Sequence, residues 1–173
     1  MDLQEAILKR RSVRMFDETV QIDDATVTRI LESAISAPSA GNRQCWHFIV
    51  VRDEILRQRL AIEAGHQLFI AKAPVVIVVC ADMENAAGGY GARGSALYCI
   101  QETAAAIENM LLTVVSLGLG SCWIGAFNEA VASEILELPE NLRPVAMLPI
   151  GALGEVSKRI PTRKSINEIA TFK

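Results

Sequence analysis

Residues 75–81 read Val-Val-Ile-Val-Val-Cys-Ala, seven apolar residues in succession and rich in β-branched side chains. A strand with one face in water alternates apolar and polar residues, whereas an unbroken apolar run is typical of a strand covered on both faces. The sequence therefore predicts a buried strand at the centre of a layered domain.

Further elements are expected on either side of this strand. Trp46–Val51 and Val145–Gly151 read as two more strands, with a short strand or turn at Cys122–Ile124. Helical spacing and capping residues predict helices at 27–35, ending before Pro38, at 53–64, at 95–117, and from Asn128 to about Leu138-Pro139. The chain has no repeat, low-complexity segment or interior linker, so residues 1–173 are expected to form one α+β domain.

The helix expected at 95–117 is apolar around most of its circumference. Such a helix suits either a core or the centre of a subunit interface. The whole chain is 51% hydrophobic, with a mean hydropathy of +0.28, which is more apolar than a monomer of this size usually needs. We therefore expect a homodimer with an apolar interface.

Composition also excludes several classes of protein. The net charge of −3 and the pI near 5.5 argue against nucleic-acid binding, which requires a dominant basic face. The longest apolar region, Thr103–Leu119, contains Glu108 and Asn109 and so predicts a buried helix, not a membrane span. The N-terminus lacks a signal-peptide core, and the cysteines are widely spaced, which is typical of reduced thiols. We expect a soluble cytoplasmic protein with no nucleic-acid or membrane partner.

The strongest candidate for a binding site is the basic stretch Arg10-Arg11-Ser12-Val13-Arg14-Met15-Phe16. Guanidinium groups bind phosphate in a bidentate manner, so three of them beside a hydroxyl indicate an anionic ligand. Alternatively, Arg10 and Arg11 complement the dipole at the end of a first helix that Asp2 caps. A second basic cluster, Lys158–Lys164, could meet the first and bind the same phosphate.

Three glycine-containing stretches are less specific. The turn at 38–44 (Pro-Ser-Ala-Gly-Asn-Arg-Gln) has small residues that allow close approach of a flat ligand, although an ordinary loop is the better explanation of such a turn in isolation. Residues 82–94 carry four glycines and predict a mobile loop. Gly118-Leu119-Gly120-Ser121 lacks the Lys-Ser/Thr of a phosphate loop, so Gly118 reads as a helix C-cap.

No side-chain catalyst is evident. His47 alternates with apolar residues in an expected strand, His66 reads as a surface residue, and no metal-ligand spacing or Ser/His/Asp order occurs. If the protein is an enzyme, its chemistry must come from a cofactor, and we expect no metal.

The order of these motifs resembles that of the FMN-dependent nitroreductase superfamily. The resemblance is carried by 10–16, by 37–46, by 118–127 (Gly-Leu-Gly-Ser-Cys-Trp-Ile-Gly-Ala-Phe), and by the stretches 73–78, 149–151 and 163–169. It covers nearly the whole chain, although the chain is short for the family. At Glu102 many relatives have Asp, and at Ser165 many have Pro.

The resemblance implies a mainly antiparallel mixed sheet flanked by helices, in an intertwined homodimer with two FMN sites at its interface. Arg10 and Ser12 would bind the phosphate and ribityl chain of FMN, and Arg14 would reach the pyrimidine edge. Arg163 and Lys164 would close on the phosphate, with Lys158 and Arg159 as the alternative pair.

The remaining implied contacts involve the flavin ring. The turn beginning at Pro38 would come from the other subunit to cover the ring, Gln67 would read the pyrimidine, and backbone near Ile124 would approach flavin N5. The full set of cofactor-binding residues expected on this basis is Arg10, Arg11, Ser12, Arg14, Pro38, Ser39, Ala40, Asn42, Gln67, Ile124, Gly125, Arg163 and Lys164.

The implied activity is that of an FMN-dependent NAD(P)H oxidoreductase. Hydride would pass from NADH or NADPH to flavin N5 and then to a small-molecule acceptor such as a nitroaromatic or a quinone, with no catalytic side chain. No dinucleotide-binding fingerprint is present, so the nicotinamide would bind transiently over the flavin. The alternative is a non-catalytic flavin-binding or redox-sensing module, because the short chain lacks the segment that walls the substrate pocket in larger members.

Overall fold

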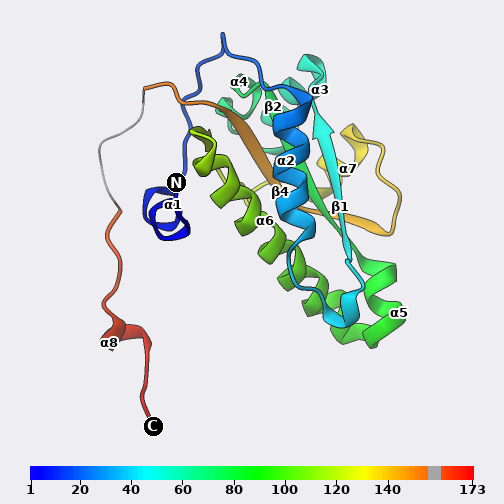
Figure 1. The fold of residues 1–173 in the computed structure, drawn as a ribbon. Helices are drawn as coiled ribbons and strands as arrows, with labels where there is room; N and C mark the ends of the chain where they lie inside the picture. The colour runs from blue at the N-terminus through cyan, green and yellow to red at the C-terminus, as the bar shows by residue number, and fades with distance from the viewer. Residues whose placement is uncertain (156–160) are drawn as a thin grey trace.

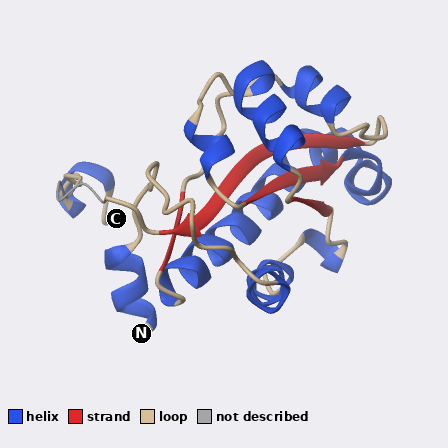
Figure 2. Ribbon diagram, turned by 90° about the horizontal axis from the view of Figure 1, so that it is seen from above, coloured by secondary structure: helices blue, strands red, loops and turns tan. Residues whose placement is uncertain are grey.

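The computed structural model describes residues 1–155 and 161–173, and its centre is a four-stranded sheet (Figure 2). The strands are β1 (Trp46–Val51), β2 (Val75–Asp82), β3 (Leu119–Ser121) and β4 (Leu142–Ala152), in the order β1-β2-β4-β3. All neighbouring strands are antiparallel, and the one parallel pairing in the described residues is an isolated bridge between Ser12 and Ser121. The expected α+β fold is confirmed.

Strand β2 is the buried strand that its sequence predicted. Every residue from Val75 to Ala81 is fully buried. Successive side chains of a strand point to opposite faces, and here they enter two separate cores. Ile77 and Val79 belong to the core on one face, whereas Val76 and Val78 belong to the core on the other. A continuous apolar run is thus required because both faces of the sheet are covered.

Helices form a layer on each face (Figure 1). One core lies beneath α2 (Asp24–Ile35) and α6 (Cys99–Ser116), which pack against each other. The other core contains residues of the π-helical turn η2 (Leu60–Ala64), α4 (Phe69–Lys72) and α7 (Glu129–Ile135). Helix α3 (Glu54–Arg59) continues directly into η2, so the helix predicted at 53–64 is confirmed.

The expectation of a mobile loop at 82–94 was wrong. Residues Met83–Arg93 form helix α5, and the Asp82 carboxylate caps it by accepting a hydrogen bond from the backbone N–H of Asn85 at 3.0 Å. A Cβ at Gly89 would lie 2.5 Å from Cδ of Arg43, so this glycine permits close packing. The helix kinks only at Tyr90-Gly91 before it continues through the π-helical turn η3 (Gly94–Tyr98) into α6.

Two boundaries also differ from expectation. Strand β3 ends at Ser121, before the predicted Cys122–Ile124, although Ile124 still forms an isolated bridge with Met147 of β4. Helix α7 ends at Ile135, about three residues early. Both shifts are small because caps and apolar spacing define the centre of an element better than its ends.

The two ends of the chain lie outside the sheet layers (Figure 1). Helix α1 (Leu3–Lys9) is capped by Asp2, as expected, through a 2.8 Å bond from the backbone N–H of Glu5. The last described segment, 161–173, contains the short helix α8 (Ile166–Ile169) and is exposed throughout, with Phe172 at 85%.

Candidate functional site

Residues 10–16, the arginine segment, follow α1 and are held against the edge of the sheet. The backbone N–H of Val13 donates to the Ser121 carbonyl of β3 at 2.8 Å, and Phe16 bridges to Leu153. Val13 and Phe16 are each 7% exposed, whereas the side chains of Ser12 and Arg14 remain exposed. Burial of two apolar residues thus fixes the segment and leaves its polar groups available to a ligand.

Two glycines after α6 make this docking possible. Gly118 has φ of +76°, the left-handed conformation in which a glycine commonly ends a helix, and so confirms the predicted end of α6. A Cβ at Gly120 would lie 2.8 Å from Cγ1 of Val13 and from Cδ2 of Leu153. Only glycine at 120 therefore lets the arginine segment approach β3 this closely.

A cavity of about 670 Å³ opens beside this segment. Its volume falls in the range of small-molecule and cofactor sites. The residues around it are Arg10, Arg11, Ser12, Val13, Arg14, Met15, Glu155, Pro161, Thr162 and Arg163. Among the described residues, four guanidinium groups from the two ends of the chain thus face one cavity, against the single carboxylate of Glu155.

The arginines around the cavity differ in how they are held. Arg10 is also the C-cap residue of α1, and its Nε lies 3.8 Å from Oε1 of Glu108 on α6. The Arg14 guanidinium lies over the ring of Phe69, 5.8 Å from its centre. Of the residues predicted from the tail, Arg163 lines the cavity and Lys164 does not, while Lys158 and Arg159 lie outside the described residues. The helix-end and anion-site interpretations of Arg10 are therefore compatible.

A second group of predicted residues lies around a smaller hollow of about 220 Å³. Pro38, Ser39 and Ala40 line it on one side, facing the start of α6. Asn42 belongs to the same turn but not to the lining of the hollow. This turn is well ordered by hydrogen bonds, among them one from the Gln44 N–H to the Ser39 hydroxyl at 3.1 Å.

Gln67, Ile124 and Gly125 form a third group. The Gln67 amide donates to the carbonyls of Gly65 and Ala126, each at 3.3 Å, which brings it beside the 124–126 backbone. Ile124 is buried and exchanges two 3.0 Å backbone hydrogen bonds with Met147, while Gly125 is exposed. Residues nearly 60 positions apart are thus adjacent, as the predicted site requires.

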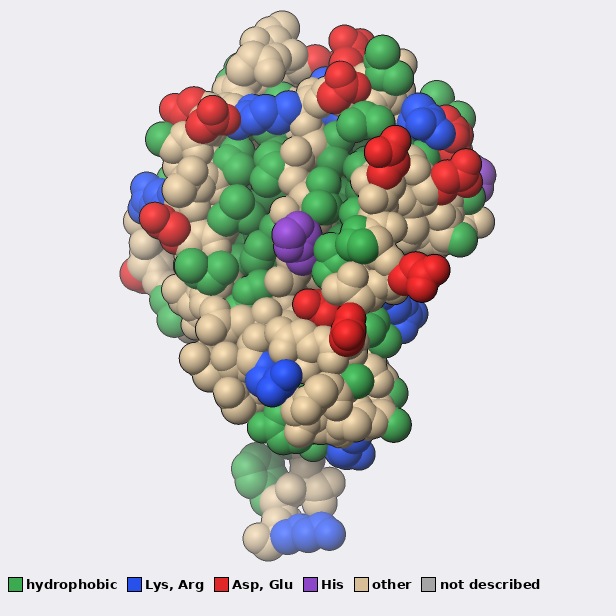
Figure 3. Space-filling model, turned by 90° about the vertical axis from the view of Figure 1, so that its right-hand side faces the viewer, with side chains coloured by type: hydrophobic (Ala, Val, Ile, Leu, Met, Phe, Trp, Pro, Cys, Tyr) green, Lys and Arg blue, Asp and Glu red, His purple; other side chains and the backbone are tan. Residues whose placement is uncertain are grey.

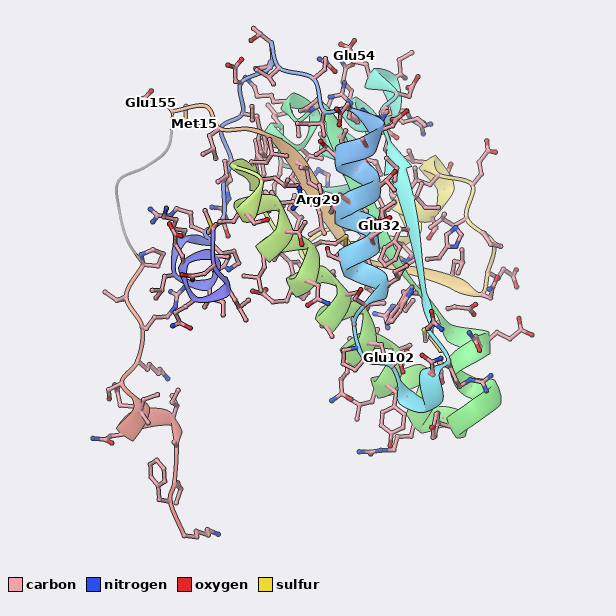
Figure 4. All side chains as sticks on the ribbon, viewed as in Figure 1. Met15, Arg29, Glu32, Glu54, Glu102 and Glu155 are labelled. Atoms are coloured by element: carbon pink, nitrogen blue, oxygen red, sulfur yellow. The ribbon has the colours of Figure 1, made fainter. Side chains whose placement is uncertain are left out.

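The arginine segment and the turn at 38–44 lie towards opposite ends of α6. The arginine segment pairs with β3, the strand that follows the C-terminal end of α6. The turn at 38–44 instead contacts Glu102, which lies at the N-terminal end of α6. Figure 4 shows the same separation, with Met15 and Glu155 close together at one end and Glu102 at the other. Neither cavity is lined by both groups of residues.

The thiols are unsuited to nucleophilic chemistry. All four cysteines are buried and unpaired. Burial raises the pKa of Cys80 to about 12, and burial together with the nearby Glu102 carboxylate raises the pKa of Cys45 to about 11. Within residues 1–155 and 161–173, no group of three or more metal-ligating side chains occurs. The arginines around the larger cavity suit it to binding an anionic ligand.

Sequence reasoning alone did not identify the roles of Glu102, Glu108 and Glu155. Glu102 binds backbone N–H groups 57 and 62 residues away, and Glu108 meets an arginine near the N-terminus. Glu102 and Glu108 stand in apolar helical surroundings and Glu155 follows β4, and none of the three belongs to a motif that reveals such contacts. Only the three-dimensional fold brings these partners together.

Comparison with known proteins agrees with this architecture. The sequence profile of the Nitroreductase family matches residues 7–64 and 61–152. An NADH dehydrogenase of Thermus thermophilus is 31% identical over 196 residues, covering 96% of this chain and 95% of that protein. An FMN reductase (NADPH) of Bacillus subtilis is 27% identical, covering 91% and 68% respectively. A nitroreductase family protein of Clostridium novyi has a solved structure with a TM-score of 0.80 and 32% identity, covering 90% and 87%.

The family match and the relatives named NADH dehydrogenase and FMN reductase place the protein among the oxidoreductases. More specifically, the chain belongs to the nitroreductase family. Of the helices in the described ranges, none combines the length and the apolarity that crossing a membrane demands.

Proposed function

We propose that the protein is an FMN-dependent NAD(P)H oxidoreductase that reduces nitroaromatic compounds, quinones or similar small acceptors. The observation that carries this proposal is the cavity faced by Arg10, Arg11, Arg14 and Arg163. A phosphate dianion needs several guanidinium partners, and the volume of the cavity suits a cofactor-sized ligand. The names of the relatives, FMN reductase (NADPH) and NADH dehydrogenase, support both the flavin and the nicotinamide.

The proposed roles of the residues follow from their placement. Arg10, Arg11 and Ser12, with Arg163 from the tail, bind and neutralise the phosphate end. Arg14 places a positive charge near the pyrimidine edge, where it stabilises negative charge on a reduced ring. Bound FMN would supply the redox chemistry, accepting a hydride from NADH or NADPH and passing it to the acceptor.

The residues proposed to meet the ring come from two places. Gln67 and the exposed backbone at Gly125 lie beside each other in one chain. The Pro38–Ala40 side of the turn lies towards the other end of α6, so we propose that it reaches the ring of the second subunit. Lys164 is proposed as a further phosphate ligand, although Arg163 alone of this pair lines the cavity.

We propose a homodimer, because the turn at Pro38–Ala40 lies too far along α6 from the arginine segment to meet the same ligand within one chain. The dimer interface is proposed to contain helix α6, which is apolar around most of its circumference, and Figure 3 shows a further gathering of hydrophobic side chains on the face beside the edge strand β1. The tail also exposes Ile166, Ile169 and Phe172, which a second chain could cover. Light scattering is expected to give the mass of a dimer, and a stable monomer with FMN bound would refute this arrangement. The unpaired buried thiols favour the reducing cytoplasm as its location.

The first experiment identifies the cofactor. The purified protein is denatured, and the released chromophore is compared with FMN and other flavins. Arg10→Ala is expected to weaken FMN binding by about 1.5–3 kcal/mol, because it removes a charge-assisted contact. Arg29→Ala is the matched control, since Arg29 lies exposed on α2, outside the cavity (Figure 4). A protein that fails to bind added FMN would refute the proposal.

The second experiment separates an enzyme from a flavin-binding or redox-sensing module. Anaerobic mixing with NADH or NADPH should bleach the flavin absorbance, and nitro compounds or quinones should then accelerate steady-state NAD(P)H oxidation. Tight FMN binding without acceptor-dependent turnover would favour the module. Helix α5 stands where a mobile loop was expected at 82–94, so mobility of that segment does not favour the module.

A further inference from the structure

Glu102 is the one charged side chain that is buried among the described residues, with 6% of its surface exposed. Its Oε1 accepts a hydrogen bond from the N–H of Ala40 at 2.8 Å, and its Oε2 accepts one from the N–H of Cys45 at 3.3 Å. Burying a carboxylate costs several kcal/mol unless hydrogen bonds compensate it. Here the compensation comes from two backbone groups at the two ends of one turn.

The turn that Glu102 holds has a strained backbone. Gly41, Asn42 and Gln44 have φ of +58°, +55° and +55°. A residue other than glycine pays about 1–3 kcal/mol in this region, and such conformations persist only where the surroundings impose them. Asn tolerates the left-handed region better than Gln does, so Gln44 is the most demanding position. It lies directly before Cys45, whose N–H binds Glu102.

A second set of contacts fixes the other side of the turn. Nε of Arg43 donates to the Asn85 carbonyl at 2.9 Å, and the Asn85 side-chain amide donates to the Arg43 carbonyl at 3.0 Å. A Cβ at Gly41 would lie 2.7 Å from the Tyr90 hydroxyl, so α5 also closes over the turn. The turn is therefore held in one shape by α5 on one side and by Glu102 of α6 on the other.

We propose that Glu102 is a positioning residue for the flavin. This inference rests on the proposed function, in which Pro38, Ser39 and Ala40 cover the flavin ring of the partner subunit. By binding both ends of the turn, the buried carboxylate fixes the shape in which these residues meet the ring. Glu102 itself accepts hydrogen bonds from two backbone N–H groups of the turn and does not contact the ligand.

A carboxylate is required because both of its oxygens accept hydrogen bonds. Glutamine at 102 would retain one acceptor and turn an NH2 group towards either the Ala40 or the Cys45 N–H, leaving that donor unpaired. Aspartate would keep both oxygens but is one methylene shorter, so it would reach the two N–H groups less well. The two substitutions therefore test the acceptor count and the reach separately.

The test compares Glu102→Gln with the wild type and with Glu32→Gln, a surface carboxylate on α2 (Figure 4). We expect Glu102→Gln to bind FMN about tenfold more weakly, which corresponds to about 1.4 kcal/mol, and to shift the absorption spectrum of the bound flavin. Glu102→Asp should fall between the two, and Glu32→Gln should match the wild type. Glu102→Gln with wild-type affinity and spectrum would overturn the inference, even if its thermal stability fell.

A double variant distinguishes a positioning role from a merely structural one. Gln44→Gly removes the strain at φ +55°, so the turn needs less restraint to keep its shape. Glu102→Gln/Gln44→Gly should therefore recover part of the lost FMN affinity, whereas a general loss of stability would not be relieved in the affinity of the folded protein. No recovery would count against the inference.

Two remaining outcomes are also decisive. If Glu102→Gln fails to fold, Glu102→Asp decides: weaker FMN binding supports the inference, and unchanged binding and spectrum overturn it. A wild-type protein that binds no FMN would overturn the proposed function together with this inference. A wild type that binds FMN, with variants that bind it equally well, would overturn the inference alone.

Discussion

Gly120→Ala is expected to damage the ligand site without touching any residue that binds the ligand. The added Cβ would lie 2.8 Å from Cγ1 and 3.0 Å from Cβ of Val13, and 2.8 Å from Cδ2 of Leu153. Because Cβ of Val13 is attached to the backbone, rotating the side chain cannot relieve the contact. The arginine segment must instead move away from β3 and stretch the 2.8 Å bond between the Val13 N–H and the Ser121 carbonyl.

The size of the effect follows from this geometry. Overpacking by one methyl group in a close-packed region costs about 1–3 kcal/mol. For a domain of this size, each kcal/mol lowers Tm by roughly 2–4 °C, so the apo protein should melt roughly 2–12 °C lower. FMN affinity should fall at least about tenfold, since misplacing the arginine segment forfeits more than one charge-assisted contact, each worth about 1.5–3 kcal/mol.

Gly118→Ala is the matched control two residues away. A Cβ at Gly118 meets nothing within 4 Å, but the residue has φ of +76°. Alanine there costs about 1–2 kcal/mol of backbone strain, with no steric push on the arginine segment. Both variants should therefore lose stability in thermal unfolding at equal protein concentration. Only Gly120→Ala should lose FMN affinity in a fluorescence titration, and an equal affinity in both variants would refute the reasoning.

Three further outcomes are expected. Burial raises the pKa of Cys80 to about 12 and that of Cys45 to about 11, so neither thiol should react with iodoacetamide at pH 8 until the protein is unfolded, as mass spectrometry would show. The Arg143 guanidinium donates two hydrogen bonds, of 2.8 and 2.9 Å, to the Glu129 carboxylate and so lowers the pKa of Glu129. This half-exposed pair should contribute about 0.2–1 kcal/mol to stability in a double-mutant cycle at pH 7. That contribution should vanish as the pH falls through the lowered pKa. Ile77→Ala should cost about 2–5 kcal/mol in urea unfolding, because Ile77 is fully buried in the core beneath α2 and α6; a loss below 1 kcal/mol would contradict that packing.

The sheet was predictable from sequence where burial has a local signature. The strands at 75–81 and 46–51 formed as expected. The first is apolar throughout because both of its faces are covered, and the second has partly exposed residues because it lies at the edge of the sheet. Helix α5 was not predicted, since glycines normally favour turns. Its helical form depends on the Asp82 cap and on Arg43 packing against Gly89, and that packing involves a residue more than forty positions away.

The candidate site was predictable only in part for a similar reason. The arginines and the small-residue turn carry chemical signatures in sequence, so both could be identified. That Arg163 from the tail faces the same cavity as Arg10 could not be predicted, because more than 150 positions separate the two residues. Glu102 stood out only as a departure from the Asp of many relatives, and its role could not be predicted because its partners are backbone N–H groups that any residue could supply.

Helix α6 connects these observations. Its first turn supplies the carboxylate that shapes the turn at 38–44, and its last turn leads through Gly118 and Gly120 to the strand on which the arginine segment docks. Eighteen residues of α-helix span about 27 Å, so one rigid element fixes the two halves of the proposed site and also keeps them apart. Two chains that placed their α6 helices side by side in opposite directions would bring the turn of one next to the arginines of the other. In the proposed homodimer, the apolar circumference of α6 would serve both purposes, with one face packed on the sheet and α2 and another turned towards the second chain.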